Sequence, residues 1–219
     1  MTIEIRSGYI PQSKRLIENP TADQLRELTA RMPNARRTSY DNYNVQTRVD
    51  ARSTKNTYIV TDRPQEHTAQ TVTPEEGRKW AKIQDEYIRE QEMVLLDGAI
   101  GNDPTFLTPA RLIIEARNAN VAGMQRHLYY PPQPGQQPEV TMIYTPNLKA
   151  PGYPNDRLIL VDLEAGITRV FNSDYFGESK MSRRRAGSGC GTRKCTTPAD
   201  SPCTLAVRSS PSEGRSASS

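Results

Sequence analysis

The sequence predicts an α/β domain followed by a disordered tail. Up to about residue 180, apolar residues recur at strand and helix spacings, and beyond it the composition changes abruptly. Residues 181–219 hold all three cysteines and no aromatic residue. Such a segment cannot bury enough apolar surface to offset its ordering entropy. We therefore expect a folded region over 1–180, with an extended arm over about 1–18, and a basic, disordered tail over 181–219.

Composition excludes several classes of protein. No apolar run approaches the ~20 residues that span a bilayer, which argues against a transmembrane helix. The N-terminal residues lack the basic and apolar regions of a secretory signal, so we expect a cytoplasmic protein. The net charge of +4 does not by itself imply a nucleic-acid partner. An odd number of cysteines argues against a disulfide scaffold.

Two helices have clear start signals. Thr21 can cap a helix with Gln24 at the capping-box position, and Pro33 follows its end. A second helix starts at Thr73-Pro74, with proline in its first turn. Its apolar stripe, which we expect to pack into the core rather than to bind a ligand, comprises Trp80, Ile83 and Tyr87.

The pattern of the rest of the domain predicts strands and one further helix. The helix is expected over 118–130, before a proline-rich loop at 131–138. Strands are expected at 58–60, 93–96, 111–116, 139–144, 158–163 and 167–171, the last two joined by a turn at 164–166.

Standard catalytic and metal-binding spacings are absent from the sequence. There is no phosphate loop and no dinucleotide fingerprint. His67 and His127 are isolated, and the cysteine spacing fits no standard zinc pattern, so we expect no metal site. The run Arg183–Arg185 could contact RNA or an anionic membrane. We favour solvated charge, because no aromatic residues interleave with it.

Three polar clusters could carry chemistry. They span residues 52–58, 144–153 and 173–180, each beside a predicted strand. Arg52 could hold a carboxylate through two parallel hydrogen bonds. Each cluster could equally be an ordinary polar connection, and the residues alone leave both interpretations open.

In this order the clusters resemble the ATP-dependent phosphoenolpyruvate carboxykinases. The similarity spans roughly residues 45–180, with Asn56 in place of the usual acid and Phe176 in place of a small residue. The matching segments are Arg52-Ser53-Thr54-Lys55-Asn56-Thr57-Tyr58, Leu96–Pro104, Arg111–Tyr130 and Tyr175-Phe176-Gly177-Glu178-Ser179-Lys180. The resemblance implies the mixed sheet with helices of that family's N-terminal lobe.

The resemblance also implies a reaction. Oxaloacetate loses carbon dioxide, and the enolate takes the γ-phosphoryl group of ATP to give phosphoenolpyruvate, a step of gluconeogenesis. Arg52 and Tyr175 would bind substrate, and Tyr175 and Lys180 would be the catalytic residues. ATP and a divalent metal, Mg²⁺ or Mn²⁺, are the family's cofactors.

The sequence departs from the family after Lys180. The next residue, a lysine metal ligand in the family, is Met181, whose thioether is a poor ligand for a hard cation. The family's phosphate loop, metal ligands and nucleotide-binding lobe do not follow. Phosphoryl transfer depends on those groups. We therefore expect an inactive fragment that binds no cofactor, binds oxaloacetate weakly or not at all, contacts neither membrane nor nucleic acid, and is monomeric or prone to aggregate.

The genetic code offers a reason for the changed tail. The codons can be read in a shifted frame, in which the last base of each codon joins the first two bases of the next. From Ala186 to Asp200, codons that encode the present residues can then also encode Arg-Leu-Arg-Met-Trp-Asn-Glu-Lys-Val-Tyr-His-Ala-Gly-Gly. Continuing to Gly214 permits an apolar strand and a glycine turn. This element order is the one the family has before its phosphate loop. We interpret the tail as out of frame after a shift near 180–186, which is either real or a sequencing error.

Three alternatives remain. The tail could be a natural, unrelated disordered segment. The chain could be a non-catalytic binding protein whose basic tail contacts nucleic acid, which would show steeply salt-dependent affinity. It could also be an oxaloacetate-binding remnant that depends on Arg52.

Overall fold

The computed structural model describes residues 7–49, 54–67, 69–101, 103 and 107–179. The predicted tail, with its cysteines and arginine run, lies outside these residues. The helices are α1 (Ala22–Ala30), α2 (Pro74–Ile88) and α3 (Ala119–Leu128), and residues 176–179 are also helical. The strands are β1 (Arg15–Glu18), β2 (Ala35–Arg37), β3 (Tyr43–Val45), β4 (Thr57–Val60), β5 (Gln70–Val72), β6 (Glu92–Ile100), β7 (Thr108–Glu115), β8 (Val140–Thr145), β9 (Leu158–Asp162) and β10 (Ile167–Phe171).

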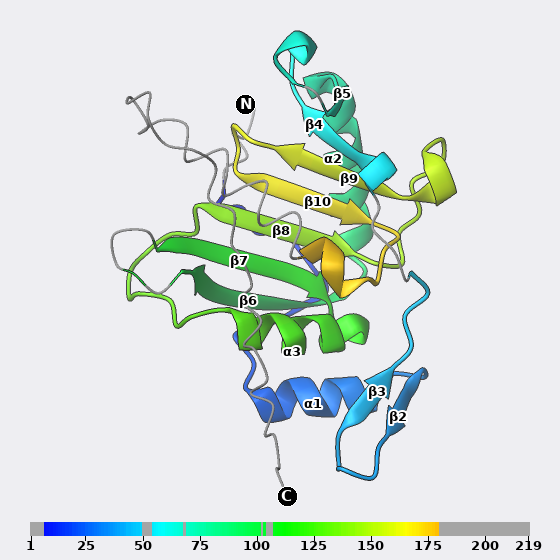
Figure 1. Cartoon of the computed structure of the whole chain (residues 1–219), viewed down its shortest axis with the longest axis vertical. Helices are drawn as coiled ribbons and strands as arrows, with labels where there is room; N and C mark the ends of the chain where they lie inside the picture. Colours follow the sequence, from blue (N-terminus) through cyan, green and yellow to red (C-terminus); the bar gives the residue numbers. More distant parts are fainter. Residues whose placement is uncertain (1–6, 50–53, 68, 102, 104–106, 180–219) are drawn as a thin grey trace, which may run out of the picture.

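The predicted α/β class is confirmed by a mixed sheet of eight strands in the order β1-β6-β7-β8-β10-β9-β4-β5 (Figure 1). Strands β7, β8 and β10 run parallel to one another. Strand β9 is antiparallel to β10 and parallel to β4. The small hairpin of β2 and β3 lies beside α1. The carboxyl ends of β7, β8 and β10 therefore lie at the same edge as the amino ends of β9 and β4.

Local sequence signals account for the first two helices. The Thr21 hydroxyl accepts a hydrogen bond from the Gln24 amide, and the Gln24 side chain accepts one from the Thr21 amide, which confirms the capping box. At the start of α2 the Thr73 hydroxyl accepts from the Glu76 amide, with proline at the first helical position. These bonds satisfy backbone donors that would otherwise lack partners at a helix start.

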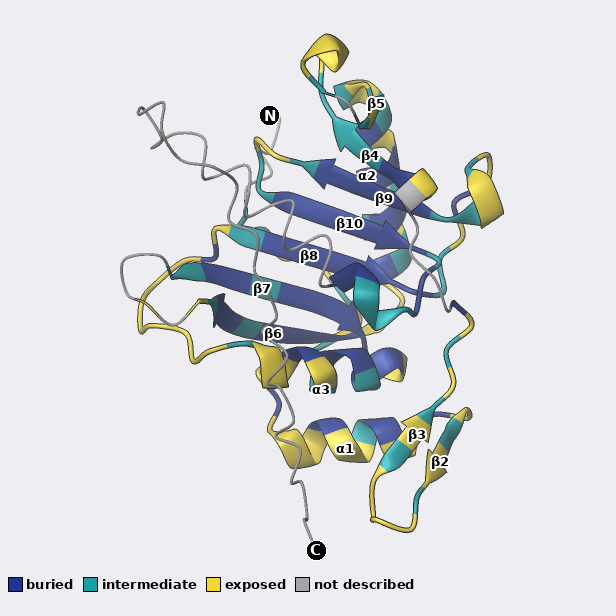
Figure 2. Ribbon diagram, viewed as in Figure 1, coloured by how far each residue is buried: buried dark blue, intermediate teal, exposed yellow. Residues whose placement is uncertain are grey.

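Helices cover both faces of the sheet. On one face, α1 and α3 pack against alternate residues of the central strands, such as Val94, Leu112 and Tyr144. On the other face, α2 packs against residues of the opposite parity, such as Leu95 and Ile113. Figure 2 shows the central strands buried along most of their length. A sheet covered on both faces has near-continuous apolar strands, which explains the runs in β6 and β9.

Several elements carry no strong local signal and were not predicted. Strand β1 lies within the expected N-terminal arm and pairs with β6 in parallel. The hairpin of β2 and β3 and the three-residue β5 are only half-buried or exposed, so they show no continuous apolar run. No described helix is long and apolar enough to cross a membrane.

A buried amide side chain joins α2 to strands β8 and β10. Gln84 is fully buried, and its Nε2 donates to Thr145 Oγ1 at 2.9 Å and more weakly to the carbonyls of Ile143 and Val170, at 3.3 Å each. Its Oε1 accepts from Arg169 Nη1 at 2.9 Å. One side chain thus satisfies polar groups of β8 and β10 together.

We predict that Gln84→Leu lowers the free energy of unfolding by about 2–4 kcal/mol, because it leaves buried donors and acceptors without partners. Urea unfolding monitored by circular dichroism measures the change. The matched substitution Lys82→Ala, at an exposed position of the same helix, should shift that free energy by less than about 0.5 kcal/mol. Equal effects of the two substitutions would contradict the role given to Gln84.

Candidate functional site

Strands β7, β8 and β10 end at the same edge of the sheet (Figure 1). The segments that follow β8 and β10 are rich in polar residues. The β8 and β10 ends are paired directly, since Phe171 lies opposite Thr145. Phe171 also lies opposite Leu158, the first residue of β9, and β4 begins one register step away. In open α/β sheets, ligands bind outside the carboxyl ends of parallel strands. This edge is therefore the candidate site.

Tyr175 is held at this edge through its backbone and its ring. The fully buried Tyr144 hydroxyl donates to the Tyr175 carbonyl at 2.8 Å, and that carbonyl also accepts from the Glu178 amide at 3.0 Å. The Tyr175 ring lies against Gly177 so closely that a Cβ there would collide with it. Burial, followed by the charges of Glu178 and Asp174, raises the pKa of Tyr144 far above its usual value. Its hydroxyl therefore remains a neutral donor.

Asp174 links the Tyr175 turn to a distant segment. Its Oδ2 accepts from the Arg48 amide at 2.8 Å, and its Oδ1 accepts from the Val49 amide at 3.0 Å. The Arg48 guanidinium approaches the same carboxylate at 3.4 Å and donates to the Pro146 carbonyl at 2.7 Å. Asp174 has only a weak sequence signal, as a polar residue just after a predicted strand. Arg48, which is 126 positions away, has none.

Glu115 anchors the loop that leaves β8. Its buried carboxylate accepts from the Asn147 side chain at 2.8 Å and from the Asn147 amide at 3.2 Å. Arg117 pairs with it at 2.5 Å, and the Tyr87 hydroxyl donates to it at 3.2 Å. Burial, together with the Glu115 charge, raises the pKa of Tyr87 to about 12. Sequence reasoning did not single out Glu115.

The structure shows the contacts of Asn56, which stands where the resemblance implies an acid. It is buried, and its Nδ2 donates to the carbonyls of Pro154 at 2.5 Å and Arg157 at 3.0 Å. Both partners are acceptors, and an ionised carboxylate cannot donate to either. The amide therefore holds the start of β4 against the loop that precedes β9.

The structure brings the three polar clusters together in part. Residues of the second and third clusters meet directly at the ends of β8 and β10, where Tyr175 is half-buried. Of the first cluster, Asn56 lies at the same edge. Arg52, Lys180 and Met181 lie outside the described residues, so their assigned roles stay predictions.

Other candidates from the sequence belong elsewhere. Trp80 is buried, and its ring packs edge-on against Phe171 and Tyr153, with centroids 5.6 and 5.7 Å apart, so its place in the core is confirmed. His67 is half-buried, and His127 is exposed. Within the described part of the chain, no three His, Cys, Asp or Glu side chains gather where they could hold a metal ion.

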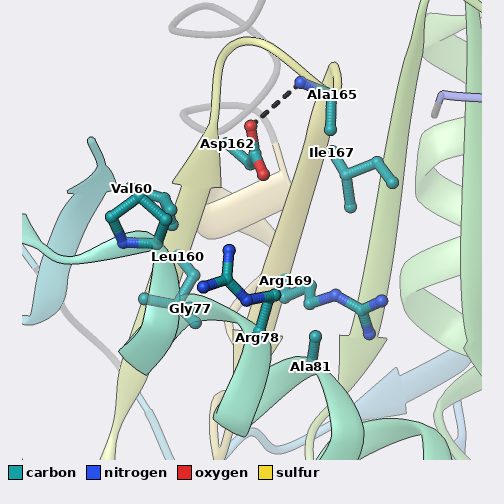
Figure 3. Close-up of a pocket in the computed structure, with 10 residues that line it drawn as sticks. Val60, Gly77, Arg78, Ala81, Leu160, Asp162, Ala165, Ile167 and Arg169 are labelled. Atoms are coloured by element: carbon teal, nitrogen blue, oxygen red, sulfur yellow. Dashed lines mark hydrogen bonds between the residues drawn. The ribbon is translucent and has the colours of Figure 1, made fainter. Parts of the chain in front are cut away.

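A cavity of about 200 Å³ lies on the α2 face of the sheet (Figure 3). Its walls include Val60, Leu160 and Ile167, with the side chains of Arg78 and Asp162 beside them. It lies toward the opposite end of β9 and β10, where the turn between them is held by a bond from the Ala165 amide to Asp162. None of the predicted site residues lines it, so it is separate from the candidate site.

Removing the Tyr144 hydroxyl tests its bond to Tyr175. We predict that Tyr144→Phe lowers the free energy of unfolding by about 0.5–1.5 kcal/mol, because one buried hydrogen bond is lost while the ring still fills its place. Denaturant titration gives the value. The control Tyr40→Phe, on a side chain that is 93% exposed, should leave stability unchanged. A Tyr144→Phe protein as stable as the parent would refute the assigned bond.

Comparison with known families supports the resemblance and extends it. A sequence profile of the family described as phosphoenolpyruvate carboxykinase, of the ATP-dependent type, matches residues 14–184. The match covers well over half of the chain and begins further toward the N-terminus than residue 45. Comparison with curated proteins gave no match. The chain therefore belongs to the ATP-dependent phosphoenolpyruvate carboxykinase family and corresponds to its N-terminal region.

Proposed function

We propose that the carboxyl edge of β7, β8 and β10 forms part of an oxaloacetate-binding site of carboxykinase type. The observation that carries this proposal is the meeting of separate polar clusters at one sheet edge in a chain of this family. The family reaction breaks the bond between oxaloacetate and its departing carboxylate. The electron pair left behind forms an enolate, whose oxygen then takes the γ-phosphoryl group of ATP.

The roles proposed for individual side chains are those that the resemblance to the family implies. Arg52 binds a carboxylate of oxaloacetate, because its planar guanidinium can donate two parallel hydrogen bonds. Tyr175 lines the same pocket with its hydroxyl near the departing carbon dioxide, and Lys180 is the second catalytic residue, contributing a positive charge. The contacts of the Tyr175 backbone and ring limit its movement, which supports a role in orienting substrate.

The chain itself is proposed to bind substrate without turning it over. ATP and a divalent metal would supply the phosphoryl group and neutralise its charge in the family reaction. The 219 residues contain no phosphate-loop sequence. We assign no residue to either cofactor, and we propose that the protein acts in the cytoplasm.

Titration with oxalate, a stable dicarboxylate, tests the substrate site. We expect saturable binding in isothermal calorimetry, and we expect Arg52→Ala to weaken it about tenfold or more, because a charge-assisted pair is lost. Arg36→Ala, which removes an exposed arginine of β2, is the matched control.

Three results would count against the proposal. They are no binding of oxalate by the parent protein, equal weakening by the two arginine variants, or steeply salt-dependent affinity for nucleic acid in place of oxalate binding. Formation of phosphoenolpyruvate from oxaloacetate and ATP by this chain would contradict the proposed inactivity.

The reading-frame interpretation is tested separately, at the level of DNA. The family match ends at residue 184, inside the interval 180–186 where the shift is proposed. We infer a frameshift that is either present in the gene or introduced by a sequencing error, and resequencing the codons from Tyr175 onward distinguishes the two. One base more or fewer than the present reading would identify a sequencing error and restore the long frame. Confirmation of the present reading would reject sequencing error and leave a genuine product with this tail.

A further inference from the structure

The carboxylate of Asp174 is a buried tether between two segments of the candidate site. Its side chain is 7% exposed. Each oxygen accepts from one of two successive backbone amides, those of Arg48 and Val49. Hydrogen bonds from backbone amides to a carboxylate are among the stronger kind, and successive amides form a natural anion-binding concavity. Asp174 thus fixes the chain at Val49 against the turn after β10.

The same carboxylate also forms an ion pair with a guanidinium. The Arg48 guanidinium approaches Oδ2 at 3.4 Å, and Nη2 of this arginine donates to the Pro146 carbonyl. Three donors therefore share the two oxygens. Because its charge is engaged in this way, Asp174 is suited to holding structure and not to contacting an anionic substrate.

Asp174 acts on Tyr175 through the backbone. The two residues are adjacent, so fixing one carboxylate fixes the turn from which the Tyr175 ring projects. The Tyr144 hydroxyl holds the Tyr175 carbonyl in place, and the Tyr175 ring packs against Gly177. Asp174 is the contact that ties the same turn to the segment ending at Val49, three residues before Arg52.

We propose that Asp174 is a positioning residue for Tyr175, a role that rests on the substrate site proposed above. It holds the turn after β10 in the orientation that presents the Tyr175 ring, and it touches no substrate. If Asp174 acted only through its charge, removing that charge would change the affinity for a dianion in the opposite direction. Removing a negative charge beside Arg48 would strengthen the binding of a dianion, whereas loss of the tether weakens it.

The experiment compares Asp174→Asn with the parent protein and with Asp162→Asn. The control substitution removes the carboxylate of Asp162, which accepts a hydrogen bond from one backbone amide, that of Ala165, in the turn between β9 and β10. Asp174→Asn keeps one acceptor oxygen and replaces the other with a nitrogen that cannot accept. Amide exchange should therefore quicken about tenfold at whichever of Arg48 and Val49 then faces that nitrogen. The ring signals of Tyr175, followed by NMR with ¹³C-labelled tyrosine, should shift or broaden. Oxalate should bind about tenfold more weakly.

A second variant distinguishes loss of these hydrogen bonds from failure of the protein to fold. Asp174→Glu keeps both acceptor oxygens, so it should restore slow exchange and the Tyr175 ring signals in part. Unchanged exchange or unchanged ring signals in Asp174→Asn would overturn the proposal, as would tighter or unaltered oxalate binding. If the parent protein binds no oxalate, the proposed substrate site fails. The exchange and ring signals then still decide whether Asp174 positions Tyr175.

Discussion

The pairing of β10 sets the geometry on which the site depends. This strand lies between β8, to which it is parallel, and β9, to which it is antiparallel. Its last residue, Phe171, therefore faces both the end of β8 and the start of β9. A shift of the register by one residue would turn every side chain of β10 to the other face. It would also separate the turn bearing Tyr175 from the loop that leaves β8.

Buried polar groups stabilise this register and hold the loops at this edge in place. Gln84 bonds to β8 and β10 from the α2 face, Glu115 holds the loop after β8, and Asp174 holds the segment that ends at Val49. A buried charge is tolerated when it is paired and hydrogen-bonded, and removing its partner is costly. The apolar core supports the sheet, whereas these polar bonds decide where its loops lie.

Much of the fold follows from local sequence signals. Helices α1 and α2 could be predicted because their caps use residues three positions apart, and the principal strands because apolar runs mark a sheet buried on both faces. Strand β1 could not be, since it is four residues long and lies at the edge of the sheet. Its pairing with β6 depends on tertiary structure and leaves no mark in the local pattern.

The site was less accessible to sequence reasoning than the fold. The resemblance pointed to Tyr175 and to the segments around it, but the partner of Asp174 lies 126 residues earlier in the chain. No periodicity or spacing reports such a contact. Asn56 stands where the resemblance implies an acid, and only its two carbonyl partners give a physical reason for an amide there.

The most direct test of this account is to locate a bound dicarboxylate on the protein. Amide chemical shifts of the ¹⁵N-labelled chain, recorded with increasing oxalate, report which residues lie near it. The account predicts that the largest changes fall at Asn147 and over 173–179, at the ends of β8 and β10. Changes confined to the cavity beside α2, around Leu160 and Ile167, would contradict it.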